Sequence, residues 1–232
     1  MYVLTIDTSN QVMGVAILKD DVVIGEIVTN IAKNHSVRLM PAIEQLMQEV
    51  SLTPDQLNRI VVAKGPGSYT GVRIGLSTAK SMAWALGIPV VGVSSLEVLA
   101  YQGRFFDGYI CPFFDARRGL VFTGIYQWKE DKLNLVYEEK NISMEEALNK
   151  LKKAGEKTLF LSPDLALHKE RIHDVLEDLA VLPDGPYHLA NPGFLGLAGL
   201  NKEPDNTHGL TPNYLRLAEA EANWIKAQEE KK

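Results

Sequence analysis

The stretch Gly65-Pro-Gly-Ser-Tyr-Thr-Gly-Val-Arg-Ile-Gly75 joins an apolar segment, residues 59–64, to a long helical pattern, residues 69–86. Glycines in such a loop let the backbone approach a ligand closely, and the free N–H groups at a helix start favour an anion. No Lys-Ser or Lys-Thr pair directly follows the last glycine, so the stretch is not a Walker loop, and its spacing is not that of a dinucleotide fingerprint. Two interpretations stay open: a phosphate-binding loop, and a tight turn from strand to helix, which the spacing favours.

The chain around this stretch predicts a mixed sheet with helices on its faces. Three β-rich segments separated by turn-like residues come first, which is typical of an antiparallel meander. Apolar residues then recur at helical spacing, after which strand and helix alternate. The predicted elements are strands 2–6, 12–18 and 22–28, helix 36–50, strand 60–63, helix 69–86 and strand 90–93.

The same order begins again after Arg104. Its predicted elements are strands 109–114, 120–128 and 133–142 and helix 143–154, which opens with a capping box. The repeat is one of architecture, and it predicts two related lobes that meet at a cleft, residues 1–104 and a smaller second lobe of residues 105–232. A last helix is predicted over residues 214–229, and we expect it to pack back on the first lobe.

The amino-acid composition argues against a strong nucleic-acid binder, a cysteine-dependent enzyme and a membrane protein. The 232 residues carry a formal net charge of -5, which disfavours strong non-specific attraction to nucleic acid. The single cysteine, Cys111, lies in an apolar run, so a buried inert thiol is expected rather than a nucleophile. No apolar run approaches the roughly 18 residues that span a bilayer, and no signal sequence precedes the first strand. We expect a cytoplasmic protein that does not contact a membrane.

The helix predicted over residues 69–86 has an unusual strip of small residues. Gly71, Gly75, Ala79 and Ala83 recur every fourth residue, so another element can approach this helix very closely. The strip can pack within its own lobe or against a partner chain. The preceding helix also has a broad apolar face that includes methionines, which adapt to partners and also fill cores.

Four segments resemble the TsaB family, also called YeaZ. They are Leu4–Ser9 with Gly14–Ile17, Lys64–Lys80, Phe114–Gly119 and Pro212–Arg216. The resemblance implies an α/β protein with the two-lobed fold of actin, Hsp70 and sugar kinases. It also implies a function: a non-catalytic subunit of the bacterial machinery that places threonylcarbamoyl on adenosine 37 of tRNA, after a TsaC-type enzyme has made threonylcarbamoyl-adenylate.

The resemblance implies partners as well. The family pairs with a TsaD-type transferase subunit, joins a TsaE-type ATPase in a larger complex and forms a homodimer when alone, without strong direct tRNA binding. The helices that match 36–50 and 68–86 form the pairing surface. The interface residues expected on this basis are Leu39, Met40, Ile43, Leu46, Met47, Val72, Gly75, Leu76, Ala79 and Ala83.

The nucleotide and metal sites of the catalytic paralogue are degenerate in this sequence. Ser95 and Leu99 stand where that paralogue has two metal-binding histidines, and the chain has no Gly-Gly pair. The remaining nucleotide-site candidates are Asp7, Thr8, Ser9, Gly65, Gly67, Ser68, Thr70 and Gly71. Asp7 can orient Mg²⁺ or water, or can cap the turn between two strands, which we favour. We expect no catalytic residue, metal or cofactor, with weakly bound ATP or ADP and Mg²⁺ as the alternative.

Other polar residues leave alternatives open. His35 at the start of a helix is expected to be a surface or capping residue. Arg117 or Arg118 can bind a carboxylate or phosphate, or can pair with Asp115 to fix a hairpin. Two further hypotheses remain: an independent ATPase or small-molecule kinase, and a peptidase. The peptidase has the weakest support, because the chain has neither His-Glu-x-x-His nor Gly-x-Ser-x-Gly.

Overall fold

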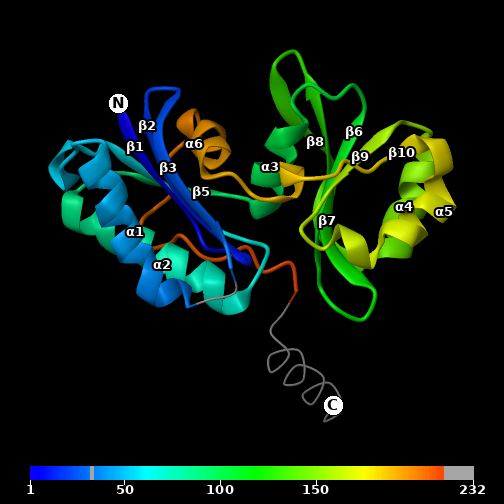
Figure 1. The fold of residues 1–232 in the computed structure, drawn as a ribbon, viewed down its shortest axis with the longest axis horizontal. Coiled ribbons are helices and arrows are strands. Elements are labelled where there is room, and N and C mark those ends of the chain that lie inside the picture. The colour runs from blue at the N-terminus through cyan, green and yellow to red at the C-terminus, as the bar shows by residue number, and fades with distance from the viewer. Residues whose placement is uncertain (32–33, 217–232) are drawn as a thin grey trace, which may run out of the picture.

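The computed structural model describes residues 1–31 and 34–216. It consists of two lobes side by side, each a five-stranded mixed sheet with flanking helices (Figure 1). This is the two-lobed α/β architecture that the sequence predicts.

The first lobe contains the strands predicted around the glycine loop, in the order β3-β2-β1-β4-β5. β1, β2 and β3 form the antiparallel meander, whereas β4 and β5 run parallel to β1. The elements of this lobe are β1 (Tyr2–Asp7), β2 (Val12–Lys19), β3 (Val22–Asn30), α1 (His35–Glu49), β4 (Arg59–Ala63), α2 (Tyr69–Leu86), β5 (Val90–Val93) and α3 (Ser95–Ala100).

Helix α2 has the bounds that its sequence predicts, because both of its ends are specified locally. The Ser68 hydroxyl accepts a hydrogen bond from the Gly71 amide at 3.2 Å and caps the first turn. Gly87 ends the helix in the left-handed conformation at φ +65°, which glycine adopts without a Cβ penalty. The start of α2 lies on the side of the first lobe that faces the second lobe (Figure 1).

The second lobe repeats the first. Its sheet order, β10-β9-β6-β7-β8, corresponds strand for strand to β5-β4-β1-β2-β3, with the same parallel and antiparallel pairs. The predicted repeat is confirmed. The elements are β6 (Tyr109–Asp115), β7 (Leu120–Lys129), β8 (Lys132–Ser143), α4 (Met144–Ala154), β9 (Thr158–Leu161), α5 (Lys169–Leu176) and β10 (Ala180–Val181), with short 3-10 turns at Pro54–Gln56, Tyr101–Gly103, Leu165–Leu167, Glu177–Leu179 and Pro186–His188.

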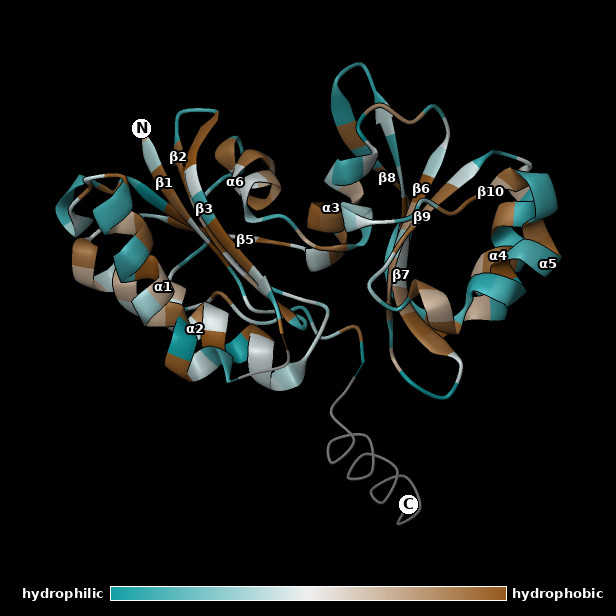
Figure 2. Ribbon diagram, in the orientation of Figure 1, coloured by the Kyte–Doolittle hydropathy of each residue, from teal (hydrophilic) through white to brown (hydrophobic). Residues whose placement is uncertain are grey.

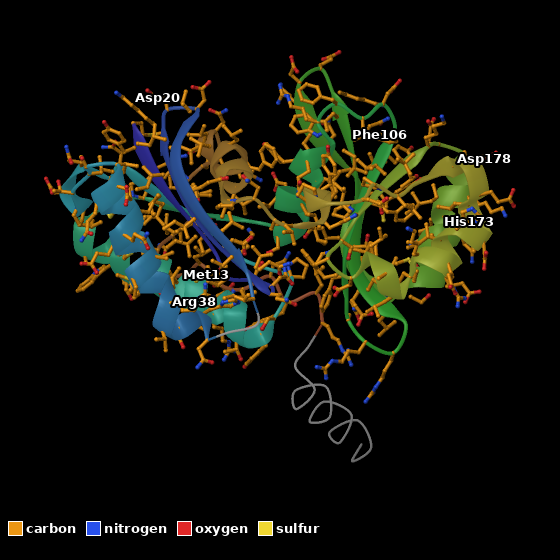
Figure 3. All side chains as sticks on the ribbon, viewed as in Figure 1. Met13, Asp20, Arg38, Phe106, His173 and Asp178 are labelled. Carbon is orange, nitrogen blue, oxygen red and sulfur yellow. The ribbon has the colours of Figure 1, made fainter. Side chains whose placement is uncertain are left out.

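Apolar residues concentrate in the strands and on the inward faces of the helices (Figure 2). Met13 lies inside the first lobe between the sheet and α1, whereas His173 and Asp178 project from the outer edge of the second lobe (Figure 3). β2 is buried from Val12 to Leu18, because helices cover both faces of its sheet.

One helix crosses the predicted domain boundary. α6 (Pro192–Leu200) belongs to the second half of the chain, yet it packs on the first lobe's sheet, where Leu195 and Ala198 contact the cluster that includes Val3 and Leu18. The chain then stays with that lobe, since the Asp205 amide donates to the Val90 carbonyl at 2.9 Å. Assigning all of residues 105–232 to the second lobe is therefore wrong. The apolar sequence of α6 fits the face of the first sheet that α1 and α2 leave uncovered.

The last predicted helix, residues 214–229, lies almost wholly outside the described residues, and Tyr214–Arg216 are not helical. In the described ranges, no helix is long and apolar enough to cross a membrane.

Candidate functional site

The glycine loop packs against the turn after β1. A Cβ at Gly67 would lie 2.1 Å from the Ser9 carbonyl oxygen, and a Cβ at Gly71 would lie 2.2 Å from the Thr8 carbonyl oxygen. The Ser68 amide donates to the Ser9 carbonyl at 2.7 Å. These two glycines therefore admit the backbone of the neighbouring turn on the side where other residues would carry a Cβ.

Asp7 ends β1 next to this contact and is buried. Its Oδ1 accepts hydrogen bonds from the Ser9 amide at 2.8 Å and the Ser9 hydroxyl at 2.7 Å, which is the expected turn cap. Burial raises the pKa of the Asp7 carboxyl, although the two bonds from Ser9 oppose that effect. Its Oδ2 is buried and has no hydrogen-bond partner among the described residues.

The other candidates of the degenerate nucleotide site have structural positions. Thr8 is buried, and its hydroxyl donates to the Gly71 carbonyl at 2.7 Å. Gly65 adopts φ +90°, a turn conformation that favours glycine. Thr70 is exposed at the start of α2. The structure thus brings all the candidates together, but as two mutually packed turns.

A cleft of about 770 Å³ lies between the lobes beside this contact. From the first lobe it is lined by the start of α2 and by His35, whose Nε2 lies 2.9 Å from the Asn10 carbonyl oxygen. From the second lobe it is lined by Asp115 and Asp164. His35 is the helix-start residue expected from the sequence, tied to the backbone of the neighbouring turn.

Asp115 ends β6 as Asp7 ends β1. Its Oδ1 lies 3.1 Å from the Nε2 of buried His168, and its Oδ2 accepts from the Arg117 amide at 3.0 Å. Asp115 therefore holds this hairpin turn through a hydrogen bond from the backbone amide of Arg117, not through the Arg117 side chain. His168 and Asp164 could not be predicted as site residues, because both come from the irregular segment after β9.

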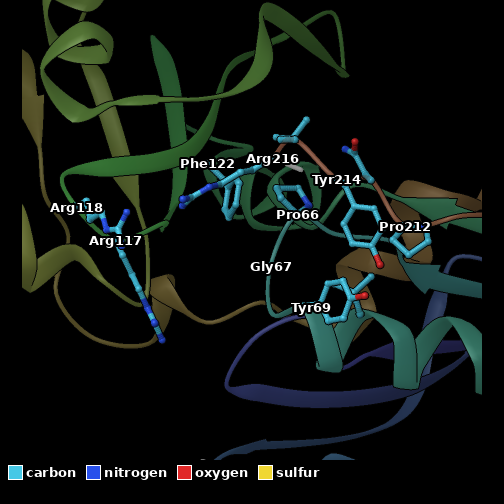
Figure 4. Close-up of a pocket in the computed structure, with 12 residues that line it drawn as sticks. Pro66, Gly67, Tyr69, Arg117, Arg118, Phe122, Pro212, Tyr214 and Arg216 are labelled. Atoms are coloured by element: carbon cyan, nitrogen blue, oxygen red, sulfur yellow. The ribbon is translucent and has the colours of Figure 1, made fainter. Parts of the chain in front are cut away.

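A smaller pocket of about 280 Å³ opens beside the cleft and shares Gly67, Tyr69, Arg117, Phe122 and Arg216 with it. Figure 4 shows the two tyrosines, Tyr69 and Tyr214, on one side and the arginines of the β6–β7 turn on the other.

The positions of the paralogue's metal ligands lie on α3. Ser95 and Leu99 are fully buried there. No group of three or more His, Cys, Asp or Glu side chains that could hold a metal occurs in the part of the chain that the structure describes. Cys111 is buried, and burial raises the pKa of its thiol to about 12, so it remains a protonated thiol at neutral pH.

The family model for TsaD, tRNA N6-adenosine threonylcarbamoyltransferase, matches residues 23–224. The tRNA threonylcarbamoyladenosine biosynthesis protein TsaB of Bacillus subtilis (strain 168) is 50% identical over 228 residues, which cover 98% of this chain and 100% of that relative. The chain belongs to the TsaB family.

Two more relatives of the TsaB family fit this assignment. The protein of the same name from Escherichia coli (strain K12) is 30% identical over 133 residues, covering 56% of this chain and 57% of the relative. A solved Pseudomonas aeruginosa structure, described as an uncharacterized protein with similarity to peptidase YEAZ, superposes with a TM-score of 0.80. It is 26% identical and covers 93% of this chain and 99% of its own.

The interface residues expected from TsaB-family resemblance are mostly core residues of this lobe. Gly75 faces the sheet, where a Cβ would lie 2.6 Å from Thr8 Oγ1, and Met40 is exposed. The remaining ones are buried in the first lobe's own core: Leu39, Ile43, Leu46, Met47, Val72, Leu76, Ala79 and Ala83. Placing the small-residue strip on a partner surface is therefore wrong, because periodicity marks a buried face without saying which surface buries it.

The outward face of the TsaB-family helices α1 and α2 carries a shallow groove instead. It is lined by Met40, Ser77, Thr78, Ser81, Met82 and Ala85. Trp84 of the same helix α2 has 70% of its surface exposed, and Val37 of α1 is 68% exposed. The two helices thus still present an exposed surface with apolar residues, formed by different residues from those expected.

Proposed function

We propose that the chain is a non-catalytic subunit in the biosynthesis of threonylcarbamoyladenosine in tRNA, and that it pairs with a TsaD-type transferase subunit. The observation that carries the non-catalytic role is the close packing of Thr8 and Ser9 against Gly67 and Gly71. A transferase of this fold needs a glycine loop that is free to hold a phosphate, and in this chain one side of that loop packs against the turn after β1.

The residues present do not fit the nucleotide that the fold family implies. Carbonyl oxygens of Ser9 and Thr8 occupy the side of Gly67 and Gly71 toward which a Cβ would point, so a phosphate could approach this loop only from the cleft side. The positions of the paralogue's metal ligands are Ser95 and Leu99, and a leucine cannot bind a metal. We therefore propose no resident metal or cofactor.

The outward groove of α1 and α2 supports pairing through these helices. Trp84 and Met40 supply exposed apolar area of the type that dominates binding energy at interfaces. Small side chains at Ser77, Ser81 and Ala85 leave the groove shallow enough for a partner helix to approach. We propose that the TsaD-type subunit occupies this surface, and that a second copy occupies it when that subunit is absent.

The rest of the assignment follows from the tRNA substrate. We place the protein in the cytoplasm, in a larger complex that includes a TsaE-type ATPase. The net charge of -5 argues against this chain being the main tRNA-binding subunit.

Pairing is tested by mixing the chain with the TsaD-type subunit of the same organism and measuring complex mass by sedimentation. Ser81→Arg places a long charged side chain in the groove and should abolish the complex while the chain remains folded. Asn149→Arg adds the same charge to exposed α4 and should pair as the wild type does. Unchanged pairing of Ser81→Arg would contradict the assigned surface.

One observation favours the alternative of an independent ATPase or kinase. The buried Oδ2 of Asp7 has no hydrogen-bond partner among the described residues. A carboxylate oxygen that orients Mg²⁺ would also lack a protein partner when the ion is absent. Calorimetry with millimolar Mg-ATP separates the two functions. Binding that Asp7→Ala abolishes would favour the alternative, and we expect no binding that depends on Asp7.

A further inference from the structure

The small pocket beside the cleft combines three arginines with aromatic rings. Arg117, Arg118 and Arg216 line it, and no carboxylate does in the part of the chain that the structure describes. This arrangement is notable in a chain whose net charge is -5. A concave site whose charged lining residues, among those that the structure describes, are all cations favours an anionic ligand.

The turn between β6 and β7 presents two of these arginines in a conformation that is unfavourable for them. Arg117 has φ +65° and Arg118 has φ +56°, in the left-handed region where Asn and Gly are preferred. Glu130 and Asp131 in the β7–β8 turn have the same conformation, so it belongs to a tight hairpin turn, and the evidence for a binding role comes from the side chains. Both arginines are exposed, and the guanidinium of Arg117 makes no hydrogen bond or ion pair within the described ranges.

Arg216 approaches the pocket from the other chain segment. Its Nη1 donates to the Ala116 carbonyl at 3.2 Å, which fixes the guanidinium beside the β6–β7 turn. The remaining donors of this planar group can bind a phosphate. Two segments that are far apart in the sequence thus bring guanidinium groups to one place (Figure 4).

The opposite side of the pocket is aromatic. The rings of Tyr69 and Tyr214 stack with centroids 5.7 Å apart, and the guanidinium of Arg73 lies 3.9 Å from the centroid of Tyr69. The Tyr214 hydroxyl accepts from Arg73 Nε at 2.7 Å. Tyr69 and Tyr214 are still 50% and 45% exposed. Arg73 thus covers one face of Tyr69, and the parts of the two rings that remain exposed are available to another ring.

We propose that this pocket binds one nucleotide unit, with the base against Tyr69 and Tyr214 and the phosphate against Arg117 and Arg216. Aromatic stacking together with arginine contacts is the chemistry by which proteins bind single nucleotides of an unpaired strand. The pocket opens into the larger cleft, so neighbouring nucleotides have room on that side. That the nucleotide belongs to an RNA strand rests on the proposed function. A free nucleotide would offer the pocket the same base and phosphate groups.

Two probes distinguish these sources. A short fluorescein-labelled single-stranded oligoribonucleotide is titrated with the full chain at several salt concentrations, and AMP is titrated by NMR. Arg117→Ala should weaken oligoribonucleotide binding and reduce the slope of log K against log salt by about 1. Tyr69→Ala should weaken binding about 5- to 100-fold with the slope unchanged, and Tyr69→Phe should retain it. Equal effects on AMP would assign the pocket to a free nucleotide.

Arg104→Ala is the matched control, because it removes the same charge at an exposed position whose partner is Asp131. The proposal is overturned if Arg117→Ala and Tyr69→Ala bind both probes as tightly as Arg104→Ala does, or if the wild-type chain binds neither probe. In the reconstituted complex, Arg117→Ala should raise the KM for RNA without changing kcat or pairing. If Arg117→Ala pairs normally and has an unchanged KM for RNA, the pocket is rejected and the proposed function is unaffected. If the wild-type chain does not pair with the TsaD-type subunit, the proposed function is rejected.

Discussion

The hydroxyl of Thr8 donates a hydrogen bond to the carbonyl oxygen of Gly71 at 2.7 Å, across 63 positions of sequence. Both groups are buried, and the bond joins the turn after β1 to the first turn of α2. A phosphate-binding site of this fold would lie between these two turns. In this chain the turns bind each other, which supports the proposed non-catalytic role.

The contact between the turns predicts that Gly71→Ala is strongly destabilising. Its Cβ would lie 2.2 Å from the Thr8 carbonyl oxygen, and backbone cannot move aside cheaply. We expect a loss of about 2 kcal/mol or more in the free energy of unfolding, measured by urea titration. Gly209→Ala, where the nearest atom is a side-chain oxygen at 3.3 Å, should lose far less. Equal stability of the two variants would show that the turns are not packed together.

The buried face of α2 predicts that Ala79→Glu unfolds the first lobe. Ala79 is fully buried, so the variant places an unpaired carboxylate in the apolar core, at a cost of several kcal/mol. Circular dichroism should show a large fall in Tm. Ser81→Arg, two residues along on the exposed face, should melt like the wild type. A folded Ala79→Glu that merely fails to pair would restore the small-residue strip as the interface.

The burial of Asp7 predicts a specific pH dependence. Because its pKa is raised in the folded state, the native protein binds the proton more tightly, and the Asp7 contribution to stability falls as pH rises above its ordinary value of 3.8. Asp7→Asn removes this effect. Its stability relative to the wild type should therefore rise between pH 4 and pH 7, as measured by urea unfolding at each pH. A difference that is flat with pH would mean that Asp7 does not titrate as a buried group.

Glu139 of β8 predicts how the lobes are held together. Its Oε1 accepts from the Ser94 hydroxyl at the start of α3 and from the Tyr126 hydroxyl, and its Oε2 accepts from Asn213 Nδ2 at 3.0 Å. Burial, with the Glu139 charge adding to it, raises the pKa of Tyr126 well above its ordinary value, so the phenol remains a donor.

Glu139→Ala should therefore lower the free energy of unfolding by about 1–3 kcal/mol, since it removes the shared acceptor of three donors. It should also increase the radius of gyration measured by X-ray scattering. Glu139→Gln, which retains an acceptor oxygen, should have a smaller effect. Unchanged values for Glu139→Ala would mean that this network does not hold the lobes.

The helices and strands that could be predicted from the sequence are specified by residues within them or at their ends. α2 was predictable because Ser68 and Gly87 specify its ends, and the strands of both lobes have β-rich sequences bounded by turn residues. The sheet on which α6 packs could not be predicted, since the sequence of a helix that is apolar on nearly every side does not indicate which sheet it covers.

The candidate site was predictable only in part. The turn residues Asp7 to Ser9 and the glycine loop were found from the sequence, but their mutual packing depends on distances between distant segments. Tyr69 and Arg216 approach the same pocket from positions that no spacing rule connects. Glu139 lies on a strand among other charged residues, so its role as a shared acceptor had no sequence signal.

The central claim, that this chain supports a transferase without catalysing the reaction, is tested most directly by tRNA modification in a reconstituted mixture. The mixture contains TsaC-type, TsaD-type and TsaE-type proteins with threonine, bicarbonate and ATP, and the chain is either added or left out. We predict that modification depends strictly on the chain, is retained by Asp7→Ala and is lost with Ser81→Arg. Full modification without the chain, or its loss in a folded and pairing Asp7→Ala variant, would contradict the claim.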